Sequence, residues 1–229
     1  MALLEIKSLQ LDFITDAGSA RAVDGVSLHL DSGETLCLVG ESGCGKSVTA
    51  QSITRLVPTP PARYVGGEIL LNGREVLKMS ARELQDVRGG VVSDVFQEPG
   101  AALNPVFRGG AQIKESLKLH QPDRATDAEV IRLLKLVGIP APELRLRNYP
   151  FEMSGGMQQR VMIAMALASE PKLLVADEPT TALDVTIQAQ ILDLLRDLKH
   201  RLGMAILLIT HNLGIVGDMA DRVAVMYAG

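Results

Sequence analysis

Residues 40–47 fit the phosphate-binding pattern G-x-x-x-x-G-K-[ST], so this segment has the residue types needed to bind phosphate groups. Its sequence is Gly-Glu-Ser-Gly-Cys-Gly-Lys-Ser. In such a loop the backbone N–H groups turn inward around phosphates, and the helix that follows directs its positive dipole end at them. Lys46 can reach the β- and γ-phosphates, and the Ser47 hydroxyl is placed to ligate Mg²⁺. The loop therefore predicts a nucleotide site. Its expected contacts are Gly40, Ser42, Gly43, Cys44, Gly45, Lys46 and Ser47.

Two adjacent carboxylates, Asp177 and Glu178, end the apolar run 173–176. In a phosphate-loop protein a strand of this kind brings such side chains to the nucleotide at its carboxyl end. Asp177 would hold Mg²⁺ through its hydration shell, and Glu178 would orient or deprotonate the attacking water. The alternative is that the two acids only cap the turn at Pro179.

Two further features would bring polar groups to phosphates. Ser154 precedes two glycines and the apolar run 161–168, so it is expected to cap a helix whose N-terminus could bind a second phosphate. On its own, Ser-Gly-Gly is usually a loop. His211 follows the predicted strand 205–210, which would put its imidazole near the γ-phosphate, although in isolation a simple polar cap on a strand would be the favoured explanation.

The elements that would position these residues follow from hydrophobic patterning. Alternation over 4–13 and 26–30 predicts half-buried antiparallel strands, and Asn72-Gly73 after an apolar run predicts a hairpin. Continuous apolar runs instead predict parallel strands that are covered on both faces. These runs are 36–39, 173–176, 205–209 and 223–225.

Helical signals fall in three places. The helix after the phosphate loop is predicted over 47–56, and a second runs over 186–202 with Gly203 as its stop. Between them, Thr126 to Glu129 has a capping-box pattern before apolar residues at helical spacing. The predicted fold class is thus α/β, with a phosphate-loop core of mostly parallel strands, an N-terminal antiparallel subdomain and an inserted helical subdomain.

Composition sets outer limits on function. The chain has 229 residues, of which 47% are hydrophobic, and a net charge of -4, which gives no global reason to expect nucleic acid as a partner. Two cysteines, Cys37 and Cys44, are too few and too close for a disulfide framework. No apolar run approaches a membrane span and no signal peptide is evident, so we expect a chain that neither is secreted nor spans a membrane by itself.

The order of the motifs resembles the ATP-binding cassette (ABC) family, and the resemblance covers essentially the whole chain. The corresponding motifs are Gly40 to Ser47 as Walker A, Gln97 as Q-loop, Ser154 to Gln158 as signature, Asp177-Glu178 as Walker B, Ala182-Leu183-Asp184 as D-loop and His211 as switch histidine. The segments 96–99, 103–105, 155–168 and 177–195 look particularly like ATPases of dipeptide, oligopeptide and nickel importers.

The resemblance implies an ATP-hydrolysing subunit that uses ATP and Mg²⁺ and pairs head to tail with an identical or paralogous ATPase subunit. Glu178, His211 and Gln97 would be catalytic, and Ser47, Gln97 and Asp177 would bind the metal. Phe13 is the candidate for stacking on adenine, with a core strand residue as the alternative. Ser154, Gly155, Gly156, Gln158 and Asp184 would complete the partner's nucleotide site.

The same resemblance implies the wider assembly. Two polytopic membrane permease subunits would dock on the Q-loop and the helical insert, a solute-binding protein would act with them, and the chain would sit peripherally on the cytoplasmic face of the plasma membrane. The expected division is an ATPase core at 1–97 and 161–229 and a helical subdomain at 98–160, within one nucleotide-binding domain over 1–229. The C-terminal extension of the family is expected to be absent.

Other functions remain open at this point. Nickel or another small solute could be imported by the same mechanism, and a non-transport ABC ATPase could act on nucleic acid or ribosomes. A regulatory module without turnover is disfavoured by Glu178, which degenerate sites commonly lose. The sequence also departs from the family at Asp94, where an apolar strand residue is expected and a buried carboxylate without a partner would be costly.

Overall fold

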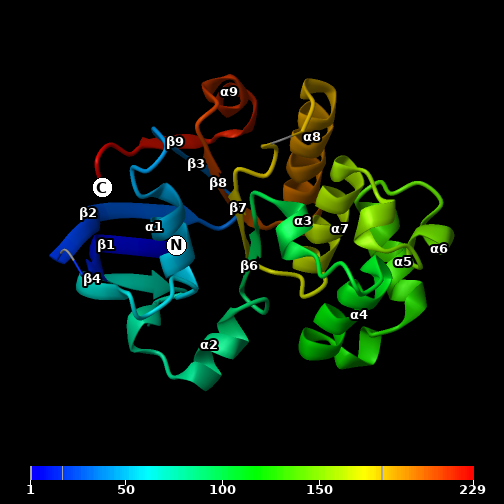
Figure 1. Cartoon of the computed structure of the whole chain (residues 1–229), viewed down its shortest axis with the longest axis horizontal. Coiled ribbons are helices and arrows are strands. Elements are labelled where there is room, and N and C mark those ends of the chain that lie inside the picture. The colour runs from blue at the N-terminus through cyan, green and yellow to red at the C-terminus, as the bar shows by residue number, and fades with distance from the viewer. Residues whose placement is uncertain (1, 17, 182) are drawn as a thin grey trace.

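The computed structural model describes residues 2–16, 18–181 and 183–229. In this structure two β-sheets pack on either side of a shared hydrophobic layer. The antiparallel sheet consists of β1 (Ala2–Thr15), β2 (Gly18–Asp31), β4 (Ala62–Leu71) and β5 (Arg74–Glu75), in the order β2-β1-β4-β5 (Figure 1). The predicted N-terminal strands and the hairpin at Asn72-Gly73 are therefore confirmed. Both hairpin residues have positive φ, 49° and 75°, as a tight strand-to-strand turn requires.

The second sheet is parallel throughout, with the strand order β6-β7-β8-β3-β9. Its strands are β3 (Thr35–Val39), β6 (Val92–Val95), β7 (Leu173–Asp177), β8 (Ala205–Thr210) and β9 (Arg222–Val225). β3 and β8 are buried along their whole length, as their apolar runs predict. For β9 the prediction of cover on both faces is wrong, because β9 is an edge strand whose Val223 and Val225 are 47% and 78% exposed.

Helices lie on both faces of the parallel sheet. The larger ones are α1 (Lys46–Ile53), α2 (Ala81–Val87), α7 (Gly155–Leu167) and α8 (Val185–Leu202), with the short α9 (Val216–Met219) near the end of the chain. The predicted α8 is confirmed, and Gly203 closes it in the left-handed conformation. The predicted α1 is too long by one turn. It ends at Ile53 because Arg55 adopts a positive φ and the Arg88 guanidinium takes the carbonyls of Thr54 and Arg55.

Between β6 and α7 the chain is almost entirely helical. It contains α3 (Pro99–Ala102), α4 (Gly109–His120), α5 (Asp127–Leu136) and α6 (Pro142–Arg145). Of these, α4, α5 and α6 lie together at one end of the molecule, and α3 lies between them and the parallel sheet (Figure 1). Single 3₁₀ turns are Val76–Lys78, Pro122–Arg124, Pro150–Glu152 and Leu213–Ile215. Because α7 continues through residue 160, the division of the chain at 98–160 stays a prediction.

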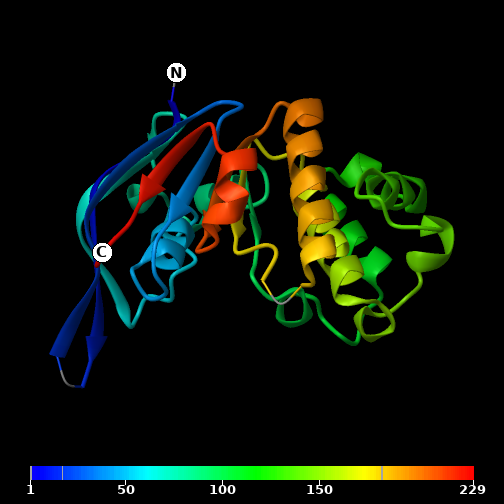
Figure 2. The ribbon, with the colours of Figure 1, turned by 90° about the horizontal axis from the view of Figure 1, so that it is seen from above.

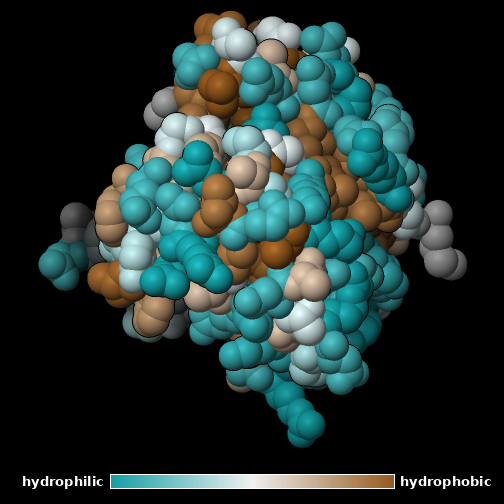
Figure 3. Space-filling model, turned by 90° about the vertical axis from the view of Figure 1, so that its right-hand side faces the viewer, coloured by the Kyte–Doolittle hydropathy of each residue, from teal (hydrophilic) through white to brown (hydrophobic). Residues whose placement is uncertain are grey.

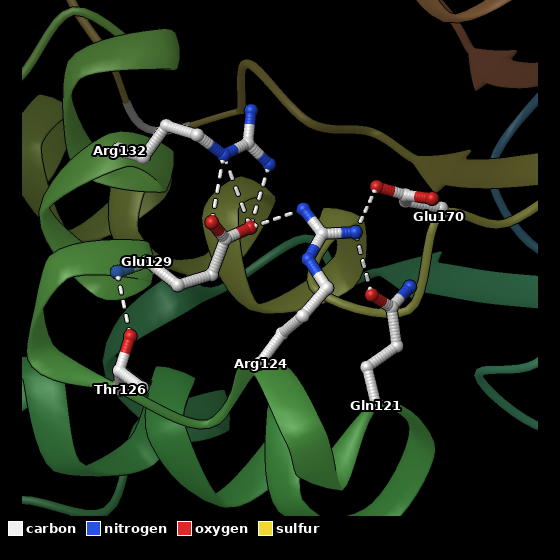
Figure 4. Close-up of polar contacts among 6 residues, drawn as sticks. All are labelled: Gln121, Arg124, Thr126, Glu129, Arg132 and Glu170. Atoms are coloured by element: carbon white, nitrogen blue, oxygen red, sulfur yellow. Dashed lines mark hydrogen bonds and ion pairs between the residues drawn. The ribbon is translucent and has the colours of Figure 1, made fainter.

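The start of α5 is fixed by a polar network rather than by the full capping box (Figure 4). The Thr126 hydroxyl accepts a hydrogen bond from the Glu129 backbone at 3.2 Å, so the cap forms. The reciprocal half is missing, because the Glu129 carboxylate instead binds Arg124 and Arg132. Arg124 also pairs with Glu170, which precedes β7, at 2.6 Å. This network ties the helical end to the connection that enters the parallel sheet.

The core has two parts, one on each face of the parallel sheet (Figure 2). On one face, Leu36, Leu38 and Leu207 pack with α1 and with the inner face of the antiparallel sheet. On the other face, Cys37 and Leu208 pack with α7, α8 and the helical end. α1, which follows the phosphate loop, is therefore clamped between two sheets.

The surface of the helical end is mostly hydrophilic, with apolar residues gathered in a band across it (Figure 3). Exposed large apolar side chains in this part of the chain are Val106, Phe107, Leu119, Leu144 and Phe151. In the described parts of the chain, no helix has the length and apolar character needed to cross a membrane.

Gly110 tests the packing of the helical end. A Cβ at this position would lie 2.4 Å from the carbonyl oxygen of Leu146, so we expect Gly110→Ala to destabilise the protein by about 1–3 kcal/mol, as overpacking does. Thermal or urea unfolding measures the change. The matched control is Gly217→Ala on α9, where a Cβ has no described atom within 4 Å and we expect little change. Equal stability of the two variants would contradict the close approach.

Candidate nucleotide site

Four strands of the parallel sheet deliver their following residues to the same edge. The phosphate loop follows β3, Gln97 follows β6, Asp177 and Glu178 end β7, and His211 follows β8. Since the carboxyl ends of parallel strands lie together, residues that are far apart in the sequence meet there. This edge carries the residues that were predicted to be catalytic.

The phosphate loop enters α1 through glycines that no other residue could replace without strain. Gly45 has φ 100° and a Cβ there would lie 2.5 Å from the Ala22 carbonyl oxygen, while Gly43 has φ 81°. Lys46 is only 5% exposed, and its Nζ donates to the carbonyls of Gly40 and Glu41 at 2.9 and 2.8 Å. The loop thus holds its lysine in place over the start of α1.

A pocket of about 600 Å³ opens over the loop, a size typical of small-molecule sites. It is lined by Phe13, Ala22, Ser42, Gly43, Gly45, Lys46, Ser47, Val48, Gln97, Glu178, Thr181 and His211. Phe13 reaches it from β1 and supplies the aromatic face that the prediction of adenine stacking needs. Gly40 and Cys44 belong to the same loop, and the Cys44 side chain is buried beneath it.

Three side chains converge on the Glu178 carboxylate. Gln97 Nε2 and Thr181 Oγ1 donate to its Oε2 at 3.1 and 2.9 Å, and His211 Nδ1 lies 2.9 Å from its Oε1. Burial alone would raise the pKa of Glu178, but the hydrogen bonds from His211 and Thr181 hold it below its usual value. Glu178 is therefore ionised at neutral pH, as a group that accepts a proton must be.

Asp177 lies in a different environment from its neighbour. Burial raises its pKa, and the charge of Glu178 adds to that effect, whereas the Ser47 hydroxyl opposes it. Its Oδ1 is buried and, among the residues that the structure describes, has no hydrogen-bond partner. A buried carboxylate oxygen without a partner beside a hydroxyl matches the oxygen ligands that Mg²⁺ takes. No three described His, Cys, Asp or Glu side chains form a metal cluster, so a metal ion here would also need water or phosphate oxygens.

The residues predicted to face a partner's nucleotide lie outside this pocket. Ser154 caps α7 by accepting from the Met157 backbone at 3.4 Å, and Asp184 caps α8 by accepting from the Ile187 backbone at 3.0 Å. Gly155 and Gly156 form the first turn of α7. The Gln158 side chain is tied to the carbonyls of Pro150 and Met153. Ala182 of the predicted D-loop lies outside the described residues.

Thr181 is a site residue that the sequence analysis missed. It stands three residues after Glu178 in the turn that follows β7, and its hydroxyl folds back onto that carboxylate. A threonine in a turn after two acids is the only sequence signal for it, and that signal is weak because such hydroxyls commonly bond to the nearby backbone. Ala22 and Val48, which also line the pocket, carry no signal in their residue type.

Comparison with known sequences identifies relatives over nearly the whole chain. Residues 23–181 match the sequence model of the family described as "ABC transporter". The oligopeptide transport ATP-binding protein OppD of Bacillus subtilis is 54% identical over 99% of this chain, and the dipeptide transport ATP-binding protein DppD of the same organism is 50% identical over 99%. The chain spans 64% of the length of OppD and 68% of that of DppD.

Solved structures share the fold. The cassette MJ0796, determined as a dimer in a post-hydrolysis state with ADP and Pi, matches with a TM-score of 0.85 at 25% identity, covering 99% of this chain and 95% of the other. The cassette cbiO1 from Clostridium perfringens matches with a TM-score of 0.83 at 27% identity, covering 100% of this chain and 86% of the other. The predicted phosphate-loop α/β fold is thereby confirmed.

Lys46 provides the direct test of the pocket. We expect Lys46→Ala to weaken the binding of a labelled ATP analogue by about 10- to 100-fold, because a charge-assisted hydrogen bond of roughly 1.5–3 kcal/mol is lost. The chain has no tryptophan, so the label must be on the nucleotide. Lys172→Ala, at an exposed position, is the matched control. Unchanged affinity in Lys46→Ala would place the nucleotide elsewhere.

Proposed function

Because the chain belongs to the ABC transporter family, we propose that it binds and hydrolyses ATP to drive the import of peptides or related solutes. The observation that carries the hydrolytic part is the Glu178 carboxylate, which is ionised and held by Gln97, Thr181 and His211 over the phosphate-loop pocket. The peptide class is supported by the oligopeptide and dipeptide transport relatives. Import of nickel or another small solute would use the same residues.

The roles of the residues follow from their positions. Lys46 exchanges its bonds to the loop carbonyls for the β- and γ-phosphate oxygens, which are stronger acceptors. Glu178 accepts a proton from the attacking water, and Gln97 and His211 orient that water and the γ-phosphate. Phe13 stacks on the adenine. Gln97 and Thr181 bind Oε2 and His211 binds Oε1, so a second acceptor position on Oε1 is left for the attacking water.

Mg²⁺ is the metal that the donor set fits. When bound, it would neutralise the charge that develops on the phosphates. Ser47 would supply its hydroxyl, Asp177 would act through its buried unpartnered Oδ1, and Gln97 would reach it from the end of β6. A cation at this position would also favour the ionised form of Asp177, whose pKa burial raises.

Two such subunits would act together. The phosphate loop lines the pocket, but Ser154, Gly155 and Gly156, which were also predicted to contact phosphate, do not line it. The first-turn N–H groups of α7 that the Ser154 cap does not take have no partner within the helix, and they suit an anion supplied by another molecule. MJ0796, a cassette of the same fold, was determined as a dimer. We infer a head-to-tail pair in which Ser154, Gly155 and Gly156 of one subunit contact the nucleotide bound by the other. Gln158 and Asp184 would belong to the same contact surface.

A groove beside Gln97 suits the membrane permease subunits. It has a volume of about 220 Å³ and lies between β6, α3 and α7. Its lining is largely apolar and includes Val92, Phe96, Ala102, Leu103, Met162 and Met165. Phe96 lines the groove, is 40% exposed and precedes Gln97 in the chain. A helix seated in the groove would therefore contact the sequence neighbour of the residue that binds the Glu178 carboxylate. A peripheral position on the cytoplasmic face, with a solute-binding protein on the other side of the membrane, completes the proposal.

Nucleic acid and ribosomes are the weaker alternative partners. The net charge of -4 supplies no general attraction for phosphate backbones.

Glu178→Gln tests the chemistry. We expect ATP binding to persist and turnover to fall by roughly 10²-fold or more, because the amide cannot accept the proton of the attacking water. Phosphate release measures turnover, and the labelled ATP analogue measures binding. Glu68→Gln, at an exposed position on β4, serves as the control and should be unchanged. Turnover at the wild-type rate in Glu178→Gln would remove Glu178 from the role of base.

The paired arrangement has its own test. In ATP, Glu178→Gln should elute at twice the mass of the monomer, because the unreacted nucleotide stays between the two subunits. Adding Ser154→Arg should restore the monomer, since a bulky side chain would fill the start of α7. Light scattering measures both masses. A monomer in Glu178→Gln at saturating ATP, or a dimer that survives Ser154→Arg, would contradict the head-to-tail pair.

A further inference from the structure

The segment that follows β9, residues 226–229, lies against the phosphate loop without lining the nucleotide pocket. Met226 extends the pairing of β9 with β3, because its N–H donates to the Val39 carbonyl oxygen at 2.8 Å. Its own carbonyl oxygen would lie 2.2 Å from a Cβ on Gly40, so the first residue of the loop passes directly over the backbone of Met226. The position at which the loop begins is therefore fixed by this contact.

The Met226 side chain supports the other end of the loop. It is buried in the part of the core that packs around α1. A Cβ on Gly45 would lie 2.7 Å from its Cε, and the buried Thr49 hydroxyl donates to its sulfur at 3.9 Å. An unbranched side chain with a weakly accepting sulfur suits such an irregular space. One methionine thus contacts both the last glycine of the loop and the first turn of α1.

Gly229 ties the middle of the loop to β2, beside which the segment ends (Figure 1). Its N–H donates to the Cys44 carbonyl oxygen at 3.1 Å, and its carbonyl oxygen accepts from the Asp24 N–H at 2.8 Å. The hydrogen bonds from this segment use carbonyl oxygens of β3 and the loop, whereas a phosphate would take the loop N–H groups. They can therefore persist when Lys46 leaves the loop carbonyls for a phosphate.

We propose that Met226 is a positioning residue that holds the empty phosphate loop in the conformation that accepts phosphates. Gly43 and Gly45 have positive φ, and glycines give such a loop many alternative conformations unless other contacts restrict it. Apparent affinity falls in proportion to the fraction of molecules whose loop is ready to bind. Bound phosphates order the loop themselves, so turnover at saturation should depend little on Met226. The effect on nucleotide rests on the proposed function, whereas the effect on the empty loop does not.

The test compares variants of the full chain. Met226→Ala removes the side-chain contacts with Gly45 and Thr49, and Met226→Leu keeps nearly the same volume. Met219→Ala is the matched control, because Met219 on α9 is also 6% exposed but packs in the other half of the core. If Met226→Ala does not fold, Met226→Val, a smaller truncation, takes its place.

Three measurements separate the loop from the rest of the protein. Hydrogen exchange of peptides covering 40–49, without nucleotide, reports the empty loop. The labelled ATP analogue, and its displacement by inorganic triphosphate, report binding with and without a base. Phosphate release gives kcat and KM. Without nucleotide, we expect the loop of Met226→Ala to exchange about tenfold faster than that of the wild type. Both ligands should then bind it about tenfold more weakly, since a tenth of the molecules would be ready to bind.

In Met226→Ala, KM should rise by a similar factor while kcat stays near the wild-type value, as expected when binding alone is affected. Met226→Leu should remain within about twofold of the wild type. Met219→Ala should be less stable but unchanged in loop exchange and affinity.

Equal loop exchange in Met226→Ala and Met219→Ala would overturn the proposal, and so would a lower kcat at unchanged KM. Weaker binding of the ATP analogue with unchanged binding of triphosphate would place the effect at the base end of the pocket and would overturn it as well. Should the wild type bind neither ligand, the proposed function fails, while exchange of the empty loop still decides the role of Met226.

Discussion

The candidate site depends on one constraint of the fold, which is that parallel strands present their carboxyl ends at one edge. β3, β6, β7 and β8 each contribute there, so a lysine, an amide, two carboxylates and an imidazole meet although they are up to 165 residues apart in sequence, from Lys46 to His211. The two halves of the core hold this edge from both sides, because one packs α1 against the sheet and the other packs α7 and α8. Any change that altered the register of these strands would separate the groups.

Adjacent carboxylates at this edge have opposite electrostatic environments. Burial raises the pKa of Asp177, whereas hydrogen bonds overcome burial and lower the pKa of Glu178. Position along the strand explains the contrast: Asp177 lies within β7 above α1, and Glu178 stands beyond the strand with a positive φ of 47° that turns it toward Thr181 and His211. This contrast in environment supports the different roles proposed for the two groups, Asp177 toward a metal ion and Glu178 toward water.

The sequence predicted the strands and most helices because buried parallel strands and the long helix α8 have strong patterns. It could not predict that α1 ends at Ile53, because the end depends on Arg88, a residue 35 positions away. It also misjudged β9, whose apolar run is typical of a central strand although the strand lies at an edge. For the site, glycines and acids carried a signal, whereas Thr181 did not. The expected cost of a buried Asp94 could not be judged from sequence either, because the residue is half-buried on β6, which lies at an edge of the sheet.

The place of β3 in the sheet bears on how the chain is made. β3 carries the phosphate loop, yet its partners β8 and β9 are formed by residues 205–225, while the antiparallel strands β1, β2 and β4 lie within the first 71 residues. During synthesis the antiparallel sheet can assemble early, but β3, which is apolar and fully buried in the finished fold, has no strand to pair with until residues 205–225 leave the ribosome. The nascent chain must therefore keep an apolar strand from aggregating while the more than 160 residues between β3 and β8 are made, and the phosphate loop gains its sheet neighbours only after that.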